Sequence, residues 1–121
     1  KTITPGPKLV GRVHDALKLK TLRRTFDTVI DSGLFHTFPD EERPGFAKIL
    51  GAVLSREGRY LMMCFSEHEP GTWGPRRVTQ AEIRGTFRDG WRVDWIRTGR
   101  FQANMEGGGN SARAWVTKIT R

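Results

Sequence analysis

One stretch of the sequence decides the fold: Phe26-Asp27-Thr28-Val29-Ile30-Asp31-Ser32-Gly33-Leu34-Phe35-His36. Its first half is apolar and β-branched. The consecutive pair Val29 and Ile30 predicts a strand that is covered on both faces in a mainly parallel sheet. Asp31-Ser32-Gly33 then ends the strand. Ligands of open parallel sheets bind beyond the carboxyl ends of the strands, so we expect a functional site at this point.

The sequence that follows predicts a helix and a second strand. The acidic run at 40–42 and Pro44 are typical of a helix start. Apolar residues then recur at helical spacing: Phe46, Ile49, Leu50, Val53 and Leu54. Residues 55–59 predict a turn around Gly58, and the apolar run at 60–66 predicts another buried strand. A strand, a helix and a strand in this order predict a parallel crossover unit.

The remaining segments predict an irregular start, a loop and an antiparallel strand pair. Residues 1–8 contain two prolines and are not expected to begin as regular structure, whereas residues 9–14 predict a weak strand. Residues 67–77 are rich in proline and glycine and predict a loop. Thr79 and Glu82 form a capping box that opens a helix expected to reach Phe87. Apolar and polar residues alternate in 91–97 and in 112–117, which predicts two antiparallel strands at the end of the sheet.

Composition predicts a single domain that spans residues 1–121. The chain is 36% hydrophobic and 28% charged, which is typical of a soluble globular domain. Its longest apolar run, residues 60–65, is too short to span a bilayer. The single cysteine, Cys64, lies inside this run and predicts a buried, reduced thiol. These features favour a cytoplasmic protein.

The formal net charge of +8 raises the question of an anionic partner such as nucleic acid. The basic residues are scattered along the chain, however, and no nucleic-acid recognition motif is present. Solvated arginine-rich faces are the simpler interpretation, and binding to nucleic acid is a minor alternative.

Several catalytic classes lack their residue pattern in this sequence. His14, His36 and His68 lie on separate segments, so no metal-binding spacing is present. Ser32 and Ser66 are not set in the Gly-x-Ser-x-Gly motif of a serine nucleophile. The glycines at 107–109 lie between late strands rather than between a strand and a helix, as a phosphate-binding loop requires.

Three expected strand ends remain as candidates for a site: His14-Asp15-Ala16, Asp31 to His36, and Ser66-Glu67-His68. If the strands are parallel, these ends share one edge of the sheet, where an adenosine-like ligand would lie. Each end alone has a simpler interpretation, since Asp15 would cap a turn, Phe35 would be core and His36 would be a surface histidine. Together, three strand ends rich in acids and small residues favour a site.

The chain resembles the later half of class I S-adenosylmethionine-dependent methyltransferases. The resemblance begins at Asp15-Ala16-Leu17 and is most specific in Phe-Asp-x-Val-x-Asp-Ser-Gly-Leu-Phe-His. It continues through residues 54–60, 64–66 and 69–78 to the closing strands. It is closest to the small-molecule branch that includes thiopurine-methyltransferase-like proteins. It implies an α/β, Rossmann-like methyltransferase sheet, mainly parallel with a C-terminal antiparallel pair, S-adenosylmethionine as cofactor and a small molecule as methyl acceptor.

The resemblance also implies roles for individual residues. Asp15 would accept a hydrogen bond from the adenine amino group, and the amide of Ala16 would meet the ring. The end of the next strand would border the methionine part of the cofactor and the transferred methyl group: Asp31, Ser32, Gly33, Leu34 and Phe35. His36 would lie near cofactor and substrate, and Asp31 or His36 would remove a proton where the acceptor carries one.

Trp73, Arg76 and Arg77 are candidate substrate contacts in the loop 67–77. The alternative is that Trp73 packs over the domain and the two arginines are solvated. These two interpretations have equal weight.

Family members begin with a strand, a glycine-rich loop and a second strand, and nothing before Asp15 matches these parts. Three explanations are open. The protein is longer at its N-terminus, or it is a short paralogue that pairs or exchanges strands in a homodimer, or it is a non-catalytic interaction module with a methyltransferase fold. Without the first two strands, the edge of the strand that ends at Asp31 would be unpaired, which is a hazard for a lone monomer. Pairing or exchange of strands across a dimer would cover this edge.

Overall fold

The computed structural model describes residues 2–3, 10–11, 25–72, 74–102 and 111–121. Six strands form one sheet in the order β2-β1-β3-β4-β6-β5. The strands are β1 (Thr2–Ile3), β2 (Val10–Gly11), β3 (Phe26–Ser32), β4 (Leu54–Phe65), β5 (Arg92–Gln102) and β6 (Ser111–Thr120). Two short 3₁₀ helices, η2 (Phe35–Thr37) and η3 (Asp40–Glu42), precede the helix α1 (Arg43–Val53), and α2 (Gln80–Thr86) follows β4.

The strand pairings make this a mixed α/β sheet, not the mainly parallel sheet that the sequence suggested. β3 and β4 are parallel neighbours, as the expected strand–helix–strand order requires. β6 lies between β4 and β5 and runs antiparallel to both. β1 is antiparallel to β2 and to β3. The predicted C-terminal antiparallel pair is thus confirmed, and it continues into the centre of the sheet.

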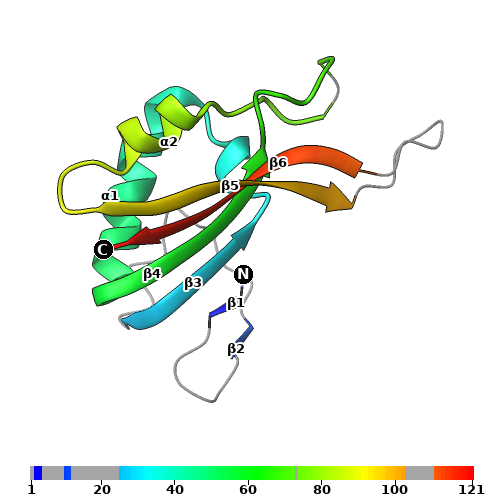
Figure 1. Cartoon of the computed structure of the whole chain (residues 1–121). Helices are drawn as coiled ribbons and strands as arrows, with labels where there is room; N and C mark the ends of the chain where they lie inside the picture. Colours follow the sequence, from blue (N-terminus) through cyan, green and yellow to red (C-terminus); the bar gives the residue numbers. More distant parts are fainter. Residues whose placement is uncertain (1, 4–9, 12–24, 73, 103–110) are drawn as a thin grey trace.

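Both helices cover the same face of the sheet (Figure 1). The described core lies under them and joins Val29, Tyr60, Met62 and Trp115 from the strands to Phe46 of α1. The prediction of a strand buried on both faces is therefore wrong for β3. Val29 faces the helices and is 4% exposed, whereas Ile30 faces the opposite side and is 42% exposed.

The N-terminal segment corrects a second expectation. Residues 1–8 were expected to be irregular, yet β1 pairs Thr2 with Ile30 and Ile3 with Val29. The edge of β3 that was expected to be unpaired therefore has a partner over two of its residues. β2 lies within the strand expected at 9–14, and the rest of that segment lies outside the described residues.

The helix α1 forms as its apolar spacing predicts, but the turn expected at 55–59 belongs to β4. β4 begins directly after α1, and its first residues form an irregularity opposite β3, between the pairs Phe26–Leu54 and Thr28–Arg59. Gly58 permits this crowded backbone, since a Cβ there would lie 2.7 Å from the carbonyl oxygen of Ser55. The interior of β4 confirms the buried strand, and Cys64 is buried as expected. Burial raises the pKa of its thiol to about 12, so the thiol stays protonated.

The capping box at the start of α2 is present and ties the helix to α1. The Thr79 hydroxyl accepts from the Glu82 amide, and the Glu82 carboxylate accepts from the Thr79 amide. The same carboxylate pairs with Arg43 at 3.1 Å and with Arg76 at 3.1 Å. Burial alone raises the Glu82 pKa, but the Thr79 amide and both guanidinium groups outweigh it and hold the pKa below its usual value. Glu82 therefore stays ionised opposite Arg43.

Arg43 is a buried cation, and the Glu82 carboxylate is its nearer ion-pair partner, with Asp40 farther away. Its side chain is 3% exposed and its guanidinium lies 4.8 Å from the centre of the Phe35 ring. Nε and Nη2 have no hydrogen-bond partner among the described residues. A buried charge that loses its ion-pair partner destabilises a fold strongly.

We expect Glu82→Ala to lower the free energy of unfolding by about 3 kcal/mol. The loss is at the lower end of the range for buried pairs because Asp40 remains 3.5 Å from Arg43. Chemical denaturation measures it. Glu41→Ala, at an exposed position of η3, is the matched control and should cost less than about 0.5 kcal/mol. Equal losses in the two variants would contradict the role of the ion pair.

Candidate functional site

The carboxyl ends of β3 and β4 lie side by side, as the sequence predicted for the second and third strand ends. The last pair of the parallel ladder joins Ser32 to Met63, and the Gly33 amide donates to the Met63 carbonyl at 3.0 Å. Gly33 has a positive φ of 91°, a conformation that glycine adopts at little cost. It turns the chain out of β3 and into η2.

Asp31 builds this turn from inside. Its side chain is 2% exposed. One carboxylate oxygen accepts from the Leu34 amide at 2.7 Å, and the other accepts from the Phe35 amide at 3.2 Å. The second oxygen also accepts from the Tyr60 hydroxyl at 2.5 Å. Burial, together with the charge of Asp31, raises the pKa of Tyr60, so the phenol remains the donor.

His36 is held between the same two strand ends. Its Nδ1 accepts from the Phe65 amide at 2.9 Å, and the ring packs edge-on against Phe65 at 5.2 Å. The side chain is 7% exposed. Burial lowers the pKa of His36 below 6.5, although the charge of Asp31 and a hydrogen bond to the Gly33 backbone act in the opposite direction. The imidazole is therefore neutral at pH 7.

These contacts argue against the expected proton-accepting roles of Asp31 and His36. The lone pair of the neutral imidazole is taken by the Phe65 amide. The Asp31 oxygens accept from two amides and a hydroxyl, and the carboxylate is buried. Both side chains shape the turn at the end of β3.

The outer surface of the turn, where the resemblance implies the methionine end of the cofactor, is partly exposed. Ser32 is exposed and Gly33 is half-buried. A Cβ at Gly33 would lie 3.4 Å from His36 Nε2 and 3.8 Å from the Phe101 ring, so the turn packs closely against these two side chains. Leu34 packs at the border of the core, and Phe35 is fully buried under α1. Phe35 therefore supports the turn from below and does not face a ligand.

The two arginines expected to contact substrate are both engaged within the chain. Arg76 pairs with Asp40 at 2.6 Å and with Glu82. Arg77 donates to four backbone carbonyl oxygens of the loop, those of Glu69, Pro70, Gly71 and Pro75. These contacts give both side chains a structural role. Trp73, Asp15 and Ala16, the other predicted contacts, lie outside the described residues.

Sequence reasoning missed two residues that position the site. Tyr60 is the only tyrosine of the chain. It pairs with Val29, two positions before the pair of Asp31 and Met62, so Tyr60 and Asp31 lie on the same face of the sheet. A polar aromatic residue inside a buried run was the available signal, because a buried hydroxyl needs a partner. Phe101 of β5 packs 5.7 Å from the His36 ring, and nothing in its local sequence indicates this long-range contact.

The described part of the chain holds neither a metal-binding cluster nor a membrane-spanning helix. No three His, Cys, Asp or Glu side chains of these residues come together as a metal site requires. None of the described helices is long and apolar enough to cross a membrane.

Comparison with known proteins gives a relative among methyltransferases. No protein-family model matches the chain. The chain is 33% identical over 84 residues to 2-heptyl-1-hydroxyquinolin-4(1H)-one methyltransferase of Mycobacteroides abscessus. The matched segment covers 68% of this chain and 37% of that protein. The chain thus spans little more than a third of this curated relative.

Solved structures with the same fold include methyltransferases. A protein from a study of the conversion of a disulfide bond into a thioacetal group during echinomycin biosynthesis matches with a TM-score of 0.77 and 22% identity, over 91% of this chain and 55% of that one. A SAM-dependent methyltransferase of Methanosarcina mazei matches with a TM-score of 0.68 and 14% identity, over 91% and 66%. Magnesium protoporphyrin IX methyltransferase of Synechocystis with bound SAM matches with a TM-score of 0.59 and 19% identity, over 89% and 43%.

The fold is therefore that of the SAM-dependent methyltransferases, and the described sheet and helices correspond to about half of such a domain. S-adenosylmethionine, the expected cofactor, is the cofactor of this class, and the Synechocystis enzyme was also crystallised with SAH.

We expect stability to fall as the pH drops below 6.5, the usual histidine value. The folded state keeps His36 neutral, so the unfolded state binds more protons between the lowered pKa and 6.5. The contribution of His36 to the free energy of unfolding is complete above pH 6.5. It is lost as the pH falls from 6.5 to the lowered pKa, by up to about 1.4 kcal/mol per pH unit. Urea unfolding across pH 4.5–7.5, a range of about three units, measures this slope.

His36→Gln should flatten the slope, because glutamine can accept from the Phe65 amide at every pH. His68→Gln, at an exposed position, is the control and should leave the slope unchanged. An identical pH dependence in the His36 variant would rule out His36 as its source.

Proposed function

We propose that this chain is the acceptor-side part of an S-adenosylmethionine-dependent methyltransferase that methylates a small molecule. The observation that carries the proposal is the rigid turn at the end of β3, which Asp31 builds at the carboxyl edge of a methyltransferase sheet. The 33% identity to a methyltransferase named for a small heterocyclic acceptor supports the small-molecule class. Membership of the thiopurine-methyltransferase-like branch belongs to the same proposal and rests on the sequence resemblance.

The cofactor, when bound, supplies a methyl group on a sulfonium, which needs an in-line approach by the acceptor. The contribution of this chain is then positioning. Ser32 and Gly33 present open backbone to the methionine end of the cofactor, and Asp31 fixes the amides of Leu34 and Phe35 so that the turn does not adjust. Proximity and orientation of this kind account for about 7–11 kcal/mol in favourable cases.

Asp31 and His36 act in this proposal as positioning residues. Their acceptor atoms are used by Tyr60 and by backbone amides. An acceptor that reacts as an anion or through a lone pair needs no protein base, which agrees with a turn that offers none.

Cofactor binding is tested by calorimetric titration of the chain with S-adenosylhomocysteine. We expect saturable binding, weakened at least tenfold by Ser32→Leu, whose added side chain would occupy the exposed surface of the turn. The control is Ala81→Leu, which adds a similar side chain to an exposed position of α2 and should leave binding unchanged. Absence of heat at millimolar ligand would contradict cofactor binding by this chain, and equal weakening by both variants would contradict its location.

The second candidate function is a non-catalytic interaction or homodimer module. It is favoured by the side chain of Ile30, which is 42% exposed on the face of β3 opposite the helices. Packing against a second copy or another protein would cover this side chain.

Light scattering at two concentrations distinguishes this candidate. A dimer that dissociates on Ile30→Glu, with Thr98→Glu at an exposed position of β5 as the control, would support it. A monomer in the unsubstituted chain would contradict it.

A further inference from the structure

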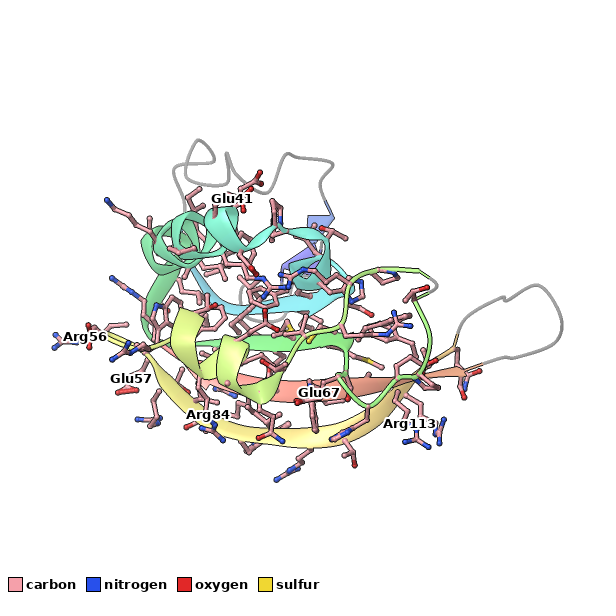
Figure 2. The ribbon with its side chains drawn as sticks, turned by 90° about the horizontal axis from the view of Figure 1, so that it is seen from above. Glu41, Arg56, Glu57, Glu67, Arg84 and Arg113 are labelled. Carbon is pink, nitrogen blue, oxygen red and sulfur yellow. The ribbon has the colours of Figure 1, made fainter. Side chains whose placement is uncertain are left out.

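A cavity of about 380 Å³ opens at the end of the β5–β6 pair. It is lined by Ser66 and His68, which follow β4, by Thr98 and Arg100 of β5, and by Arg113 of β6. β5 is parallel to β4, because β6 is antiparallel to both. The cavity therefore lies on the same edge of the sheet as the turn after β3. Figure 2 shows Arg113 at this end of the sheet, with Arg56 and Glu57 at the opposite end.

Arg100 and Arg113 face each other across the ladder. They are direct partners in the antiparallel register of β5 and β6, so their side chains leave the same face of the sheet. Like charges directly opposite each other in a sheet destabilise it. Arg100 donates to the Ser111 hydroxyl at 3.3 Å, and neither arginine has an ion-pair partner among the described residues. The fold holds an unfavourable charge pair at the mouth of a cavity.

The other lining residues include no aspartate or glutamate. Ser66 is buried, with its hydroxyl accepting from the His68 amide at 2.9 Å. The His68 ring packs edge-on against Trp115 at 5.2 Å, and Thr98 is exposed. The carboxylate next to the cavity, that of Glu69, is 9% exposed and accepts from the Arg113 backbone amide at 2.7 Å. It braces the strand and leaves both guanidinium groups facing solvent.

We propose that this cavity binds the carboxylate or phosphate group of a small molecule between Arg100 and Arg113. Guanidinium groups recognise both anions through paired hydrogen bonds. An oxyanion between the two side chains would convert their repulsion into attraction, and the hydroxyls of Ser66 and Thr98 would complete its hydrogen bonds. The volume is that of a small-molecule site. The proposal goes beyond methyl transfer and does not depend on it, since no cofactor residue takes part.

The test is a titration of the ¹⁵N-labelled chain, without cofactor, with sodium phosphate and separately with sodium benzoate at constant ionic strength. We expect saturable amide shifts concentrated at Ser66, Thr98 and Arg113. Binding by phosphate alone identifies a phosphorylated ligand, and binding by benzoate alone identifies a carboxylic acid. Absence of saturable shifts with both anions would overturn the proposal.

Arg113→Gln should weaken binding at least tenfold, whereas Arg84→Gln, which removes the same charge from an exposed position of α2, should change it less than twofold. Equal weakening would mean non-specific attraction to a basic surface and would overturn the site. A second readout is thermal unfolding in a buffer without oxyanions. Arg113→Gln removes the repulsion and should match or exceed the Tm of the unsubstituted chain, and it should lose the increase in Tm that the bound anion gives. A lower Tm would contradict the unfavourable charge pair.

Discussion

The buried carboxylate of Asp31 is the interaction on which the edge of the sheet depends. It accepts hydrogen bonds from the next turn of its own chain and from Tyr60 on the neighbouring strand. A buried carboxylate without such donors would be costly, so the turn and the β3–β4 register are fixed together. His36 adds the reverse contact, accepting from the Phe65 amide at the end of β4. The backbone that would meet a ligand is therefore stiff before any ligand arrives.

Local patterns in the sequence predicted the elements well where one physical signal dominated. The helical spacing before Leu54 gave α1, the capping box gave the start of α2, and alternation gave β5 and β6. The end of β3 and the turn that follows it also followed from the sequence, because a strand ending in an acid and two small residues is a local feature.

The errors concern relations between segments. Two adjacent apolar residues in β3 suggested burial on both faces. Whether the second face is covered depends on where the helices pack, and α1 and α2 both pack on the face of the sheet that carries Val29. The mainly parallel sheet failed for a similar reason, since the place of β6 between β4 and β5 is set by pairing across the whole sheet. Arg76 and His36 have partners in distant segments, Asp40 and the Phe65 amide, which the local sequence does not indicate.

Arg77 holds the loop 67–77 through the backbone of the loop and not through its side chains. Arg77 donates hydrogen bonds to four backbone carbonyl oxygens, those of Glu69, Pro70, Gly71 and Pro75. Every type of residue has such a carbonyl. The hydrogen bonds of Arg77 therefore do not depend on which side chains the loop carries, although Glu69 also uses its side chain on the Arg113 amide and Gly71 has a positive φ of 79°. An arginine at this position would let a loop of one shape present different side chains to different small molecules. Lysine could not replace Arg77, because a single ammonium group cannot donate to all four of the carbonyl oxygens that the planar guanidinium contacts.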